Sequence, residues 1–340
     1  MQKKAFITGI TGQDGAYLAK LLIDKGYAVT GGVRRNASQE LYRLSYLGIK
    51  DKIDLVDFDL LDVNNIVRTI KENPVDEFYN LAAHSCVGSS WNTPTYVGDV
   101  NALGVSRILD SLRTYKSDTK FYQASTSEMF GKVQEVPQRE TTKLYPRSPY
   151  GVSKVYAHYM TINYRESFNM HASSGILFNH ESPLRGVEFV TRKITSTLAR
   201  IARGSKEVLQ LGNLYSERDW GYAADYVNGM WLMLQQDTAS DYVLASGRTV
   251  SIKYFTQLVL DTLGLQVEWV GTGIDEKAID RSGTVIVEVN SKFYRPAEVD
   301  LLLGDASKAK LELGWQPELS IEDLAKLMSI ADYERAKHTS

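Results

Sequence analysis

Three glycines near the start of the chain constrain its fold more than any other feature. Gly9, Gly12 and Gly15 follow residues 5–8, an apolar run typical of a buried strand. They precede residues 16–25, where leucines recur at the spacing of an amphipathic helix. Glycines between a strand and a helix allow a tight turn and a close approach of a pyrophosphate to the helix N-terminus. The pattern therefore favours a dinucleotide-binding turn, although its spacing is G-x-x-G-x-x-G and not G-x-G-x-x-G.

Strand-like runs alternate with helical segments through the first half of the chain. After the first strand, further strands are expected at residues 27–30, 52–56, 77–81, 120–123 and 173–178. Later helices are expected at residues 191–203, 225–235 and 251–263 and after Ser320. This alternation predicts an α/β protein with a Rossmann-type doubly wound parallel sheet. We expect residues 1–180 to form the cofactor-binding domain, with later segments returning to it, and 181–340 mainly a smaller, interleaved substrate domain.

The composition excludes several classes of protein. Lysine and arginine total 39 against 41 aspartate and glutamate, so the net charge of −2 argues against a nucleic-acid partner bound by bulk charge. The single cysteine, Cys86, excludes an intrachain disulfide. No apolar run approaches the roughly 18 residues of a membrane span, and the first residues lack the apolar stretch of a signal peptide. We expect a cytoplasmic protein with no membrane partner, and no metal site because the histidines lack metal-ligand spacing.

The end of the second strand predicts which dinucleotide binds. A carboxylate there would hold the ribose 2′-hydroxyl of NAD, but this chain has Arg34 and Arg35, followed by Asn36 and Ser38. Arginines suit a 2′-phosphate, so the sequence predicts NADP. Other strand ends, where the cofactor would lie, carry Asp59, Leu60, Leu81, Ala82 and Ala83.

A tyrosine and a lysine four residues apart indicate catalytic chemistry. Tyr150 and Lys154 lie on one face of a helix expected to start at Ser148. A neighbouring cation lowers the pKa of a phenol, so Tyr150 can act as a general base toward a sugar hydroxyl while hydride leaves its carbon. The same helix is expected to have an apolar stripe formed by Val152, Val155, Tyr156 and Tyr159.

The glycine turn together with Tyr150 and Lys154 resembles the extended short-chain dehydrogenase/reductase family. Within that family, the chain is similar to the GDP-mannose 4,6-dehydratases over about residues 3–330. The motifs that carry this resemblance are residues 9–18, 125–131, 145–151, 177–186, 189–194, 211–213, 218–221 and 294–299.

The resemblance implies a redox-neutral dehydration. NADP would take hydride from C4 of the hexose while Tyr150 removes the O4 proton. Glu128 would abstract the C5 hydrogen and help to protonate the departing O6 hydroxyl, with Thr126 hydrogen-bonded near O4. Return of hydride to C6 would give a 4-keto-6-deoxy sugar. The implied catalytic residues are Thr126, Glu128, Tyr150 and Lys154.

The resemblance also implies the residues that bind the two ligands, and a homodimer or homotetramer in which residues 35–43 reach toward a neighbour's cofactor site. The cofactor set comprises Gly9, Thr11, Gly12, Gln13, Asp14, Gly15, Arg34, Arg35, Asn36, Ser38, Asp59, Leu60, Leu81, Ala82, Ala83, Tyr96, Tyr150, Lys154, His180 and Arg185. The GDP-sugar set comprises Ser85, Ser127, Asn179, Lys193, Arg218, Arg295 and Glu298, the last suited to a guanine edge.

One departure from the pattern leaves alternatives open. His84 precedes Ser85 where the GDP-mannose enzymes are expected to have glutamine. GDP-D-glycero-D-manno-heptose is therefore an alternative substrate for the same chemistry, and a 4-reductase acting on the keto sugar is another. Thr126 with Glu128 favours dehydration, because ketone reduction needs no base at C5. A non-catalytic NADP-binding scaffold is the remote alternative, and residues 268–292 receive no role.

Overall fold

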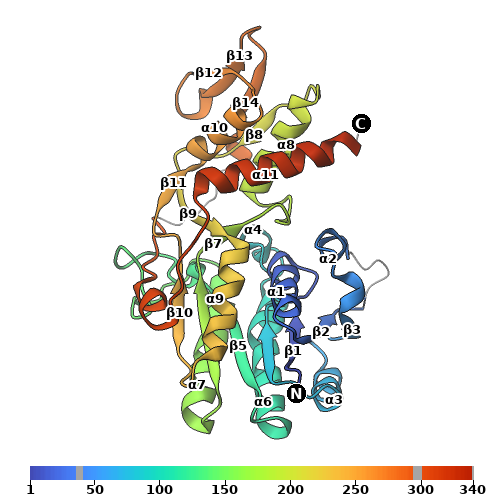
Figure 1. Ribbon diagram of the computed structural model, residues 1–340. Helices are drawn as coiled ribbons and strands as arrows, with labels where there is room; N and C mark the ends of the chain where they lie inside the picture. The colour runs from blue at the N-terminus through green and yellow to red at the C-terminus, as the bar shows by residue number, and fades with distance from the viewer. Residues whose placement is uncertain (36–40, 294–300, 339–340) are drawn as a thin grey trace.

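A parallel sheet of seven strands forms the lower part of the molecule in Figure 1. The computed structural model describes residues 1–35, 41–293 and 301–338. The strand order is β10-β6-β5-β4-β1-β2-β3, so the chain reverses its direction of winding beside β1. The predicted Rossmann-type sheet is confirmed, with one further strand, β10, that sequence analysis did not predict. The strands are β1 (Lys4–Thr8), β2 (Ala28–Val33), β3 (Asp54–Asp57), β4 (Glu77–Asn80), β5 (Lys120–Thr126), β6 (Ala172–Leu177) and β10 (Asp241–Leu244).

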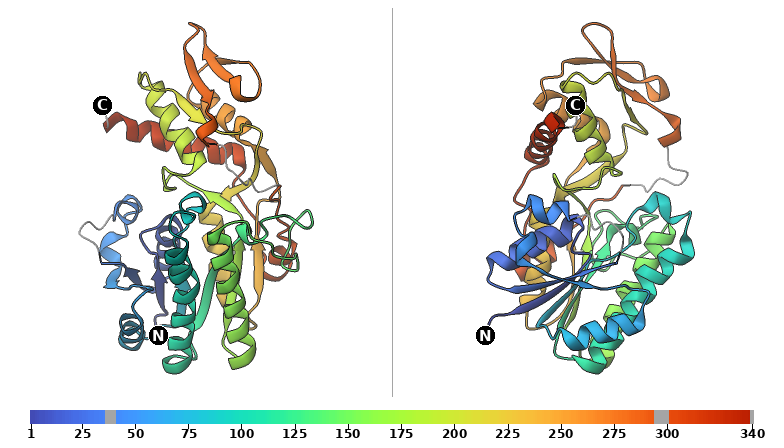
Figure 2. Two further views of the ribbon diagram at one scale, coloured as in Figure 1. Left: turned by 180° about the vertical axis from the view of Figure 1, so that it is seen from behind. Right: turned by 90° about the vertical axis from the view of Figure 1, so that its right-hand side faces the viewer.

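Helices cover both faces of this sheet (Figure 2). Side chains alternate along each strand, so neighbouring residues of β1 enter different cores. Ile7 packs with α1 (Gln13–Asp24) and α9 (Ala223–Gln235) on one face. Phe6 stacks on Phe78, with ring centroids 4.9 Å apart, on the other face. That face is covered by α3 (Val63–Glu72), α6 (Gly104–Tyr115) and α7 (Pro149–Phe168).

Short helices connect several strands at the carboxyl edge of the sheet. They contribute to the loops above the strands, where an α/β sheet binds ligands. These are α2 (Tyr42–Tyr46), α4 (Val87–Ser90), α5 (Pro94–Gly98) and the short helix η3 (Ser127–Met129), and α5 continues through residues 99–103 into α6.

An upper lobe stands above that edge and has its own apolar core (Figure 1). The three-stranded sheet β11-β9-β7 lies next to the lower part of the molecule. The four-stranded sheet β12-β13-β14-β8 lies at the far end of the upper lobe. Residues 268–292, unassigned from sequence, supply most of the second sheet. The elements are β7 (Asn179–Glu181), α8 (Val190–Ala202), β8 (Leu209–Leu211), β9 (Glu217–Tyr222), β11 (Thr249–Ser251), α10 (Ile252–Thr262), β12 (Val267–Val270), β13 (Lys277–Asp280), β14 (Val285–Val289) and α11 (Ile321–Arg335).

The two parts are interleaved along the chain. After β9 the chain returns to the lower sheet as α9 and β10 before it re-enters the upper lobe. A second return brings Trp315 into the lower core, where it meets the ring of Tyr226 edge-on at 5.5 Å. The Trp315 indole N–H donates to the carbonyl of Asp225 at 2.8 Å. The upper lobe is therefore anchored by several crossings of the chain.

Helix α7 buries the face that its sequence makes polar. Ser148 caps its start by accepting from the Gly151 N–H at 3.0 Å, and Pro149 takes the first helical position. The apolar stripe predicted for this helix points mostly outward, since Val152, Tyr156 and Tyr159 are 56%, 41% and 52% exposed. The side against the sheet carries mainly polar or small residues, namely Tyr150, Gly151, Ser153, Lys154, Ala157, His158 and Thr161.

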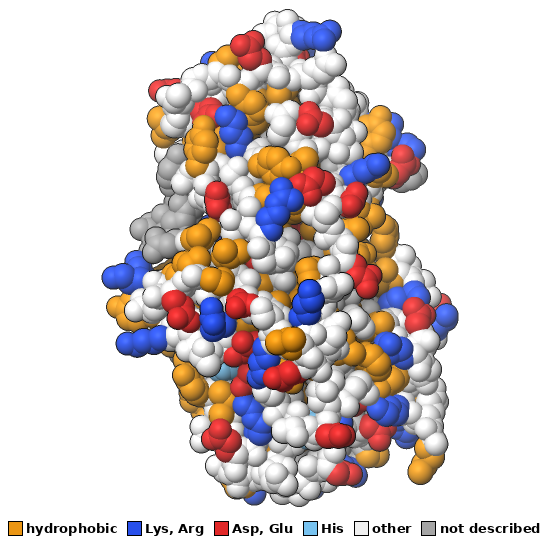
Figure 3. Space-filling view, turned by 60° about the vertical axis from the view of Figure 1, so that its left-hand side comes forward, with side chains coloured by type: hydrophobic (Ala, Val, Ile, Leu, Met, Phe, Trp, Pro, Cys, Tyr) orange, Lys and Arg blue, Asp and Glu red, His pale blue; other side chains and the backbone are white. Residues whose placement is uncertain are grey.

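The described surface mixes both signs of charge. On the face in Figure 3, lysine and arginine side chains lie among aspartates and glutamates. Among the described residues no helix has the length and apolarity that a bilayer crossing requires. Across the same residues, no three histidine, cysteine or carboxylate side chains gather as metal ligands would.

Candidate active site

The glycine turn packs directly against the end of β4. Gly9 has a φ of +68°, and a Cβ there would lie 2.8 Å from the amide nitrogen of Ala82. A Cβ on Gly15 would lie 2.3 Å from the Gly9 carbonyl oxygen. The Gly12 N–H donates to that same oxygen at 2.9 Å. Glycine is therefore required in this turn, which packs against residues 81 and 82 and leads directly into the first turn of α1, as a pyrophosphate site needs.

A buried row of polar side chains supports this turn from below. The Thr8 hydroxyl donates to Asn80 Oδ1 at 2.8 Å and accepts from the N–H groups of Leu81 and Ala82, both at 3.0 Å. Asn80 Nδ2 donates to Gln123 Oε1 at 2.9 Å. These three polar residues are register partners across β1, β4 and β5 and are almost fully buried. Sequence analysis missed their role, although polar residues at the ends of three apolar strands were the available signal.

The row ends at the catalytic lysine predicted from sequence. Gln123 Nε2 donates to the Ala124 carbonyl at 3.0 Å, and Lys154 Nζ donates to the same oxygen at 2.8 Å. Burial lowers the pKa of Lys154 to about 8. Its Nζ is 5.9 Å from the centre of the Tyr150 ring. The ammonium is thus tied to the strand beneath the tyrosine.

Burial also dominates the titration of Tyr150. It raises the pKa of the phenol to about 12, even though a hydrogen bond with Thr126 and the charge of Arg185 act in the opposite direction. The expectation that Lys154 lowers this pKa below its ordinary value is wrong for the protein alone. The physical reason is that desolvation disfavours the phenolate more than the neighbouring groups favour it.

The other two predicted catalytic residues lie at the end of β5. Thr126 Oγ1 accepts from the Glu128 N–H at 3.3 Å as η3 begins. The first turn of α7 comes so close that a Cβ on Gly151 would lie 2.8 Å from the Glu128 carbonyl oxygen. Thr126 lowers the pKa of the Tyr150 phenol and the Glu128 charge raises it, so both groups act on that phenol. The structure therefore brings Thr126, Glu128 and Tyr150 together above Lys154.

Predicted cofactor residues from distant segments bind one another at the seam between the two parts. His180 Nε2 lies 2.8 Å from Asp14 Oδ2 in a partly buried ion pair, and the imidazole ring stacks on Tyr226. Gln13 Nε2 donates to the His180 carbonyl at 3.1 Å, and Ser182 Oγ donates to Gln13 Oε1 at 2.7 Å. Burial opposes both charges, but their pairing outweighs it, so the pKa of Asp14 falls to about 2 and that of His180 rises.

The remaining cofactor residues lie along the carboxyl edge of the sheet. Arg34 donates to the Tyr96 hydroxyl at 2.7 Å, while Arg35 is exposed at the end of β2. Asp59 holds the turn after β3 by accepting from the Leu61 N–H at 3.0 Å. Leu60 is buried, and Ala83 is half-buried. Thr11 is half-buried within the glycine turn, and Asn36 and Ser38 lie outside the described residues.

The predicted substrate residues divide between the sheet edge and the upper lobe. Ser127 is buried in η3, Ser85 is exposed and Asn179 is half-buried in β7. Lys193 on α8 lies 3.5 Å above the Phe293 ring, and burial lowers its pKa. The set is completed by Arg218, which donates to the Glu217 carbonyl at 2.7 Å, and by Arg295 and Glu298, both outside the described residues.

His84, the departure from the expected pattern, is held by two neighbours. The backbone N–H of His84 donates to Asn101 Oδ1 at 2.8 Å, and the ring Nε2 lies 2.9 Å from Ser89 Oγ. The imidazole also meets the Tyr96 ring edge-on at 6.1 Å. The Tyr96 hydroxyl accepts from Arg34, so the His84 side chain contacts two of the predicted cofactor residues, Tyr96 directly and Arg34 through it.

Comparison with known proteins identifies relatives over nearly the whole chain. Residues 6–328 match the family described as GDP-mannose 4,6 dehydratase. A GDP-mannose 4,6-dehydratase of Yersinia enterocolitica is 48% identical over 353 residues, which cover 98% of this chain and 95% of the relative. The two proteins are therefore similar along almost the whole of both chains.

Solved structures share the fold at much lower sequence identity. A dTDP-glucose 4,6-dehydratase of Bacillus anthracis, in complex with NAD, has a TM-score of 0.81 at 18% identity and covers 99% of this chain and 98% of its own. The protein RMD of Pseudomonas aeruginosa, complexed with NADPH, has a TM-score of 0.77 at 21% identity, with coverages of 98% and 99%. Proteins of this fold therefore bind nicotinamide cofactors of both kinds.

Lys154 gives rise to a prediction about stability. Between its folded pKa of about 8 and its ordinary 10.5, the unfolded chain binds a proton that the folded protein does not, so stability rises with pH. Below that window both states are charged, and the buried ammonium costs roughly 3 kcal/mol at about 1.4 kcal/mol per pKa unit. We expect K154M without ligands to be more stable than wild type at about pH 7 in urea unfolding, and this advantage to shrink toward about pH 10.

A surface lysine provides the control for that measurement. Lys132 is exposed in a loop, so K132M is expected to differ from wild type by the same small amount at every pH. If the K154M advantage were constant across the window or grew with pH, the assignment of a depressed lysine pKa would be wrong.

Proposed function

This chain belongs to the GDP-mannose 4,6-dehydratase family, and we propose that Thr126, Glu128 and Tyr150 carry out its reaction. The chain is an enzyme, a hydro-lyase that removes water from GDP-mannose and leaves a 4-keto-6-deoxy sugar. One observation carries the choice of residues. Thr126 and Glu128 stand hydrogen-bonded to each other at the carboxyl end of β5, and the first turn of α7, which carries Tyr150, packs directly against Glu128.

NADP is the cofactor that we propose. The glycine turn has no room for a Cβ, so the N-terminus of α1 can meet a pyrophosphate closely. Arg35 is exposed after β2, where a 2′-phosphate would need a cation. A nicotinamide cofactor bound there would supply the acceptor for the C4 hydride and its donor at C6. These features support residues 1–180 as the cofactor-binding part.

The catalytic residues have distinct proton-transfer roles in this proposal. Tyr150 takes the proton from the C4 hydroxyl, with Thr126 hydrogen-bonded beside it. A C4 ketone makes the C5 hydrogen acidic, so Glu128 removes that proton and then protonates the hydroxyl that leaves C6. Lys154, fixed to the Ala124 carbonyl, places an ammonium under the tyrosine. When hydride is added at C6, C5 takes up a proton from solvent in place of the one lost with the C6 hydroxyl, so the sugar loses one water with no net oxidation or reduction.

The GDP moiety would bind to residues 181–340, mainly the upper lobe. Lys193 and Arg218 supply cations from α8 and β9, which suits a diphosphate. We assign Arg295 and Glu298 to the same GDP site on sequence grounds. Ser85, Ser127 and Asn179 would contact the sugar from the sheet edge and β7.

The function is tested by incubating the purified enzyme with GDP-mannose, and in parallel with GDP-manno-heptose. We expect GDP-mannose to lose one water with no net reduced cofactor, and, in deuterated solvent, to gain deuterium at C5. E128Q should lower dehydration by about a hundredfold or more, because its amide cannot act as the base. Mass spectrometry of the product and of C5 labelling measures both effects.

An exposed glutamate on another helix, α7, gives the control. Glu166 is exposed near the far end of α7, so E166Q should keep full activity. If E128Q retained dehydration and C5 labelling within about twofold of wild type, Glu128 would not be the base. Loss of water from the heptose alone would keep the mechanism and move the specificity question to His84.

The choice of NADP over NAD generates a further prediction. R35D replaces the exposed cation with an anion, so NADP binding should weaken by about 10- to 100-fold, as expected for losing a charge-assisted contact. NAD, which lacks the 2′-phosphate, should bind almost as before. Calorimetric titration of both nucleotides checks this, with R68D on the exposed side of α3 as the control. Equal losses for NADP and NAD would refute the role of Arg35.

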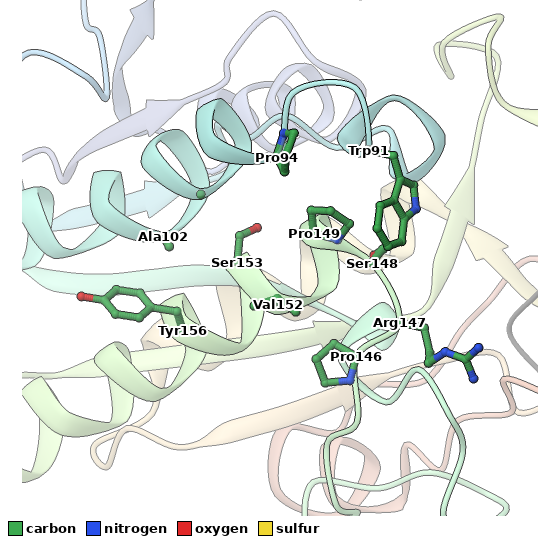
Figure 4. A pocket seen from close by; sticks show the side chains of 11 residues that line it. Trp91, Pro94, Ala102, Pro146, Arg147, Ser148, Pro149, Val152, Ser153 and Tyr156 are labelled. Carbon is green, nitrogen blue, oxygen red and sulfur yellow. The ribbon is translucent and has the colours of Figure 1, made fainter. Parts of the chain in front are cut away.

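We also propose that the enzyme is at least a homodimer, joined through the outer face of α7. Val152, Tyr156 and Tyr159 are exposed there, and Leu103 of the neighbouring helix is 46% exposed. Figure 4 shows the apolar groove beside them, which is lined by Trp91, by Pro94 at the start of α5 and by Pro149 at the start of α7. Apolar side chains of this number on one helix face indicate an interface with a second copy of the chain.

Light scattering tests this interface. Wild type should have at least the mass of two chains, and V152D should at least halve the observed mass, because it buries a charge in the apolar contact. The control is L311D, since Leu311 is apolar and 85% exposed but lies outside that face. A single-chain mass for wild type, or an unchanged mass for V152D, would exclude this dimer.

A further inference from the structure

A five-residue turn, Ser182 to Gly186, lies between the glycine turn and the upper lobe. It follows β7 and carries Arg185, whose charge acts on both Tyr150 and Asp14. Ser182 fixes its start, because the hydroxyl donates to Gln13 and accepts from the Leu184 N–H at 3.0 Å. The three residues that follow present consecutive backbone carbonyls, and all three are bound by arginine side chains.

Arg43 binds the middle carbonyl and the glycine turn at once. Its Nε donates to the Leu184 carbonyl at 2.8 Å, and its Nη1 donates to the Thr11 carbonyl at 3.0 Å. Arg43 lies in α2. One rigid guanidinium therefore spans two loops that are about 170 positions apart in sequence, and the flexible ammonium of lysine could not match that geometry.

Arg192 binds the other two carbonyls from the opposite side. Its Nη1 donates to Pro183 at 2.9 Å and to Arg185 at 2.8 Å. Its Nε faces both oxygens of Asp332, at 2.9 and 2.7 Å, and the two side chains are 8% and 2% exposed. Asp332 lies in the last turns of α11. The C-terminal helix therefore fixes Arg192, and Arg192 in turn binds the 182–186 turn.

The buried Asp332 carboxylate is fully engaged in this arrangement. Thr195 Oγ1 donates to its Oδ2 at 2.6 Å, and Arg335 Nη1 donates to its Oδ1 at 2.9 Å. A buried carboxylate that accepts four hydrogen bonds from three donor groups fixes the orientation of Arg192. The chemistry above gives no role to Arg192 or Asp332. It includes Arg43 only in the expectation that residues 35–43 reach a neighbour's cofactor site, so the contacts of Arg43 within its own chain call for another explanation.

We propose that Arg43 and the Arg192–Asp332 pair are positioning residues that clamp the 182–186 turn against the glycine turn and thereby set the affinity for the nicotinamide cofactor. The inference rests on the proposed function for the presence of that cofactor. Arg43 joins the clamp to the lower part, and Asp332 joins it to the C-terminal helix. Movement of α11 would shift Arg185 and the glycine turn together, because each is tied to the same short segment.

Cofactor binding and GDP binding separate this role from plain stabilisation. R43A and D332N should each raise the dissociation constant of NADP by roughly tenfold, as expected for residues that couple two segments. GDP, measured in the same calorimetric titration, should bind within about twofold of wild type. R43K should restore little of the loss, because one ammonium cannot reach both carbonyls. The kcat measured at saturating NADP should fall less than the apparent affinity.

The chain contains a matched pair for the control. Arg165 donates to the Ala172 carbonyl at 2.8 Å and to both oxygens of Asp241 at 3.0 and 2.7 Å, and this pair is somewhat more exposed than Arg192 and Asp332. Ala172 begins β6, so this pair lies at the amino edge of the sheet, away from the site. R165A and D241N should lower the melting temperature without changing NADP affinity.

The outcomes distinguish the two proposals. If wild type binds NADP and GDP but R43A and D332N bind NADP as tightly as it does, the clamp is overturned and the proposed function stands. If R165A and D241N lose as much NADP affinity as R43A and D332N, the effect is general destabilisation and the clamp is again overturned. If wild type binds neither NADP nor NAD, both the cofactor assignment and the clamp fail.

Discussion

The partly buried pair of Asp14 and His180 is the contact on which the site depends. Asp14 belongs to the first turn of α1, where the helix dipole favours a carboxylate, and His180 belongs to the first strand of the upper lobe. Because the glycine turn is already fixed to the end of β4 by the close approach of Gly9 to Ala82, this pair fixes the upper lobe to the sheet. The candidate active site lies at that seam. The predicted catalytic residues are on the lower part, and the predicted GDP-binding cations are on the upper lobe.

The burial that makes this seam also sets the electrostatics of catalysis. It disfavours the charged forms of both Tyr150 and Lys154, which raises one pKa and lowers the other. The protein alone therefore holds a neutral phenol. A positive charge bound beside that phenol would shift its pKa down, so a phenolate is expected only when the site is loaded. Proton removal is thereby tied to the presence of ligands, and an idle site keeps an unreactive tyrosine.

Sequence patterns reveal features whose signal is local and miss those that depend on distant contacts. The strand, glycine turn and helix at residues 5–25 follow from spacing within one segment, as do Tyr150 and Lys154 on one helix face. The clamp on the 182–186 turn joins residues 43, 192 and 332, and no local pattern indicates that these arginines meet backbone carbonyls. The pKa of Tyr150 was misjudged for a related reason, because spacing predicts a nearby cation but not the depth of burial.

The reversed polarity of α7 connects catalysis with assembly. An ordinary surface helix gains stability by burying an apolar face, whereas α7 places Ser153, Lys154 and His158 against the sheet. Each of these finds a partner, in Asn101, the Ala124 carbonyl and Ser125 respectively. Such pairing satisfies the polar groups but contributes less than apolar burial would. The apolar residues excluded from that face lie outside, so a second copy covering them would supply the hydrophobic contribution that the catalytic face of α7 gives up.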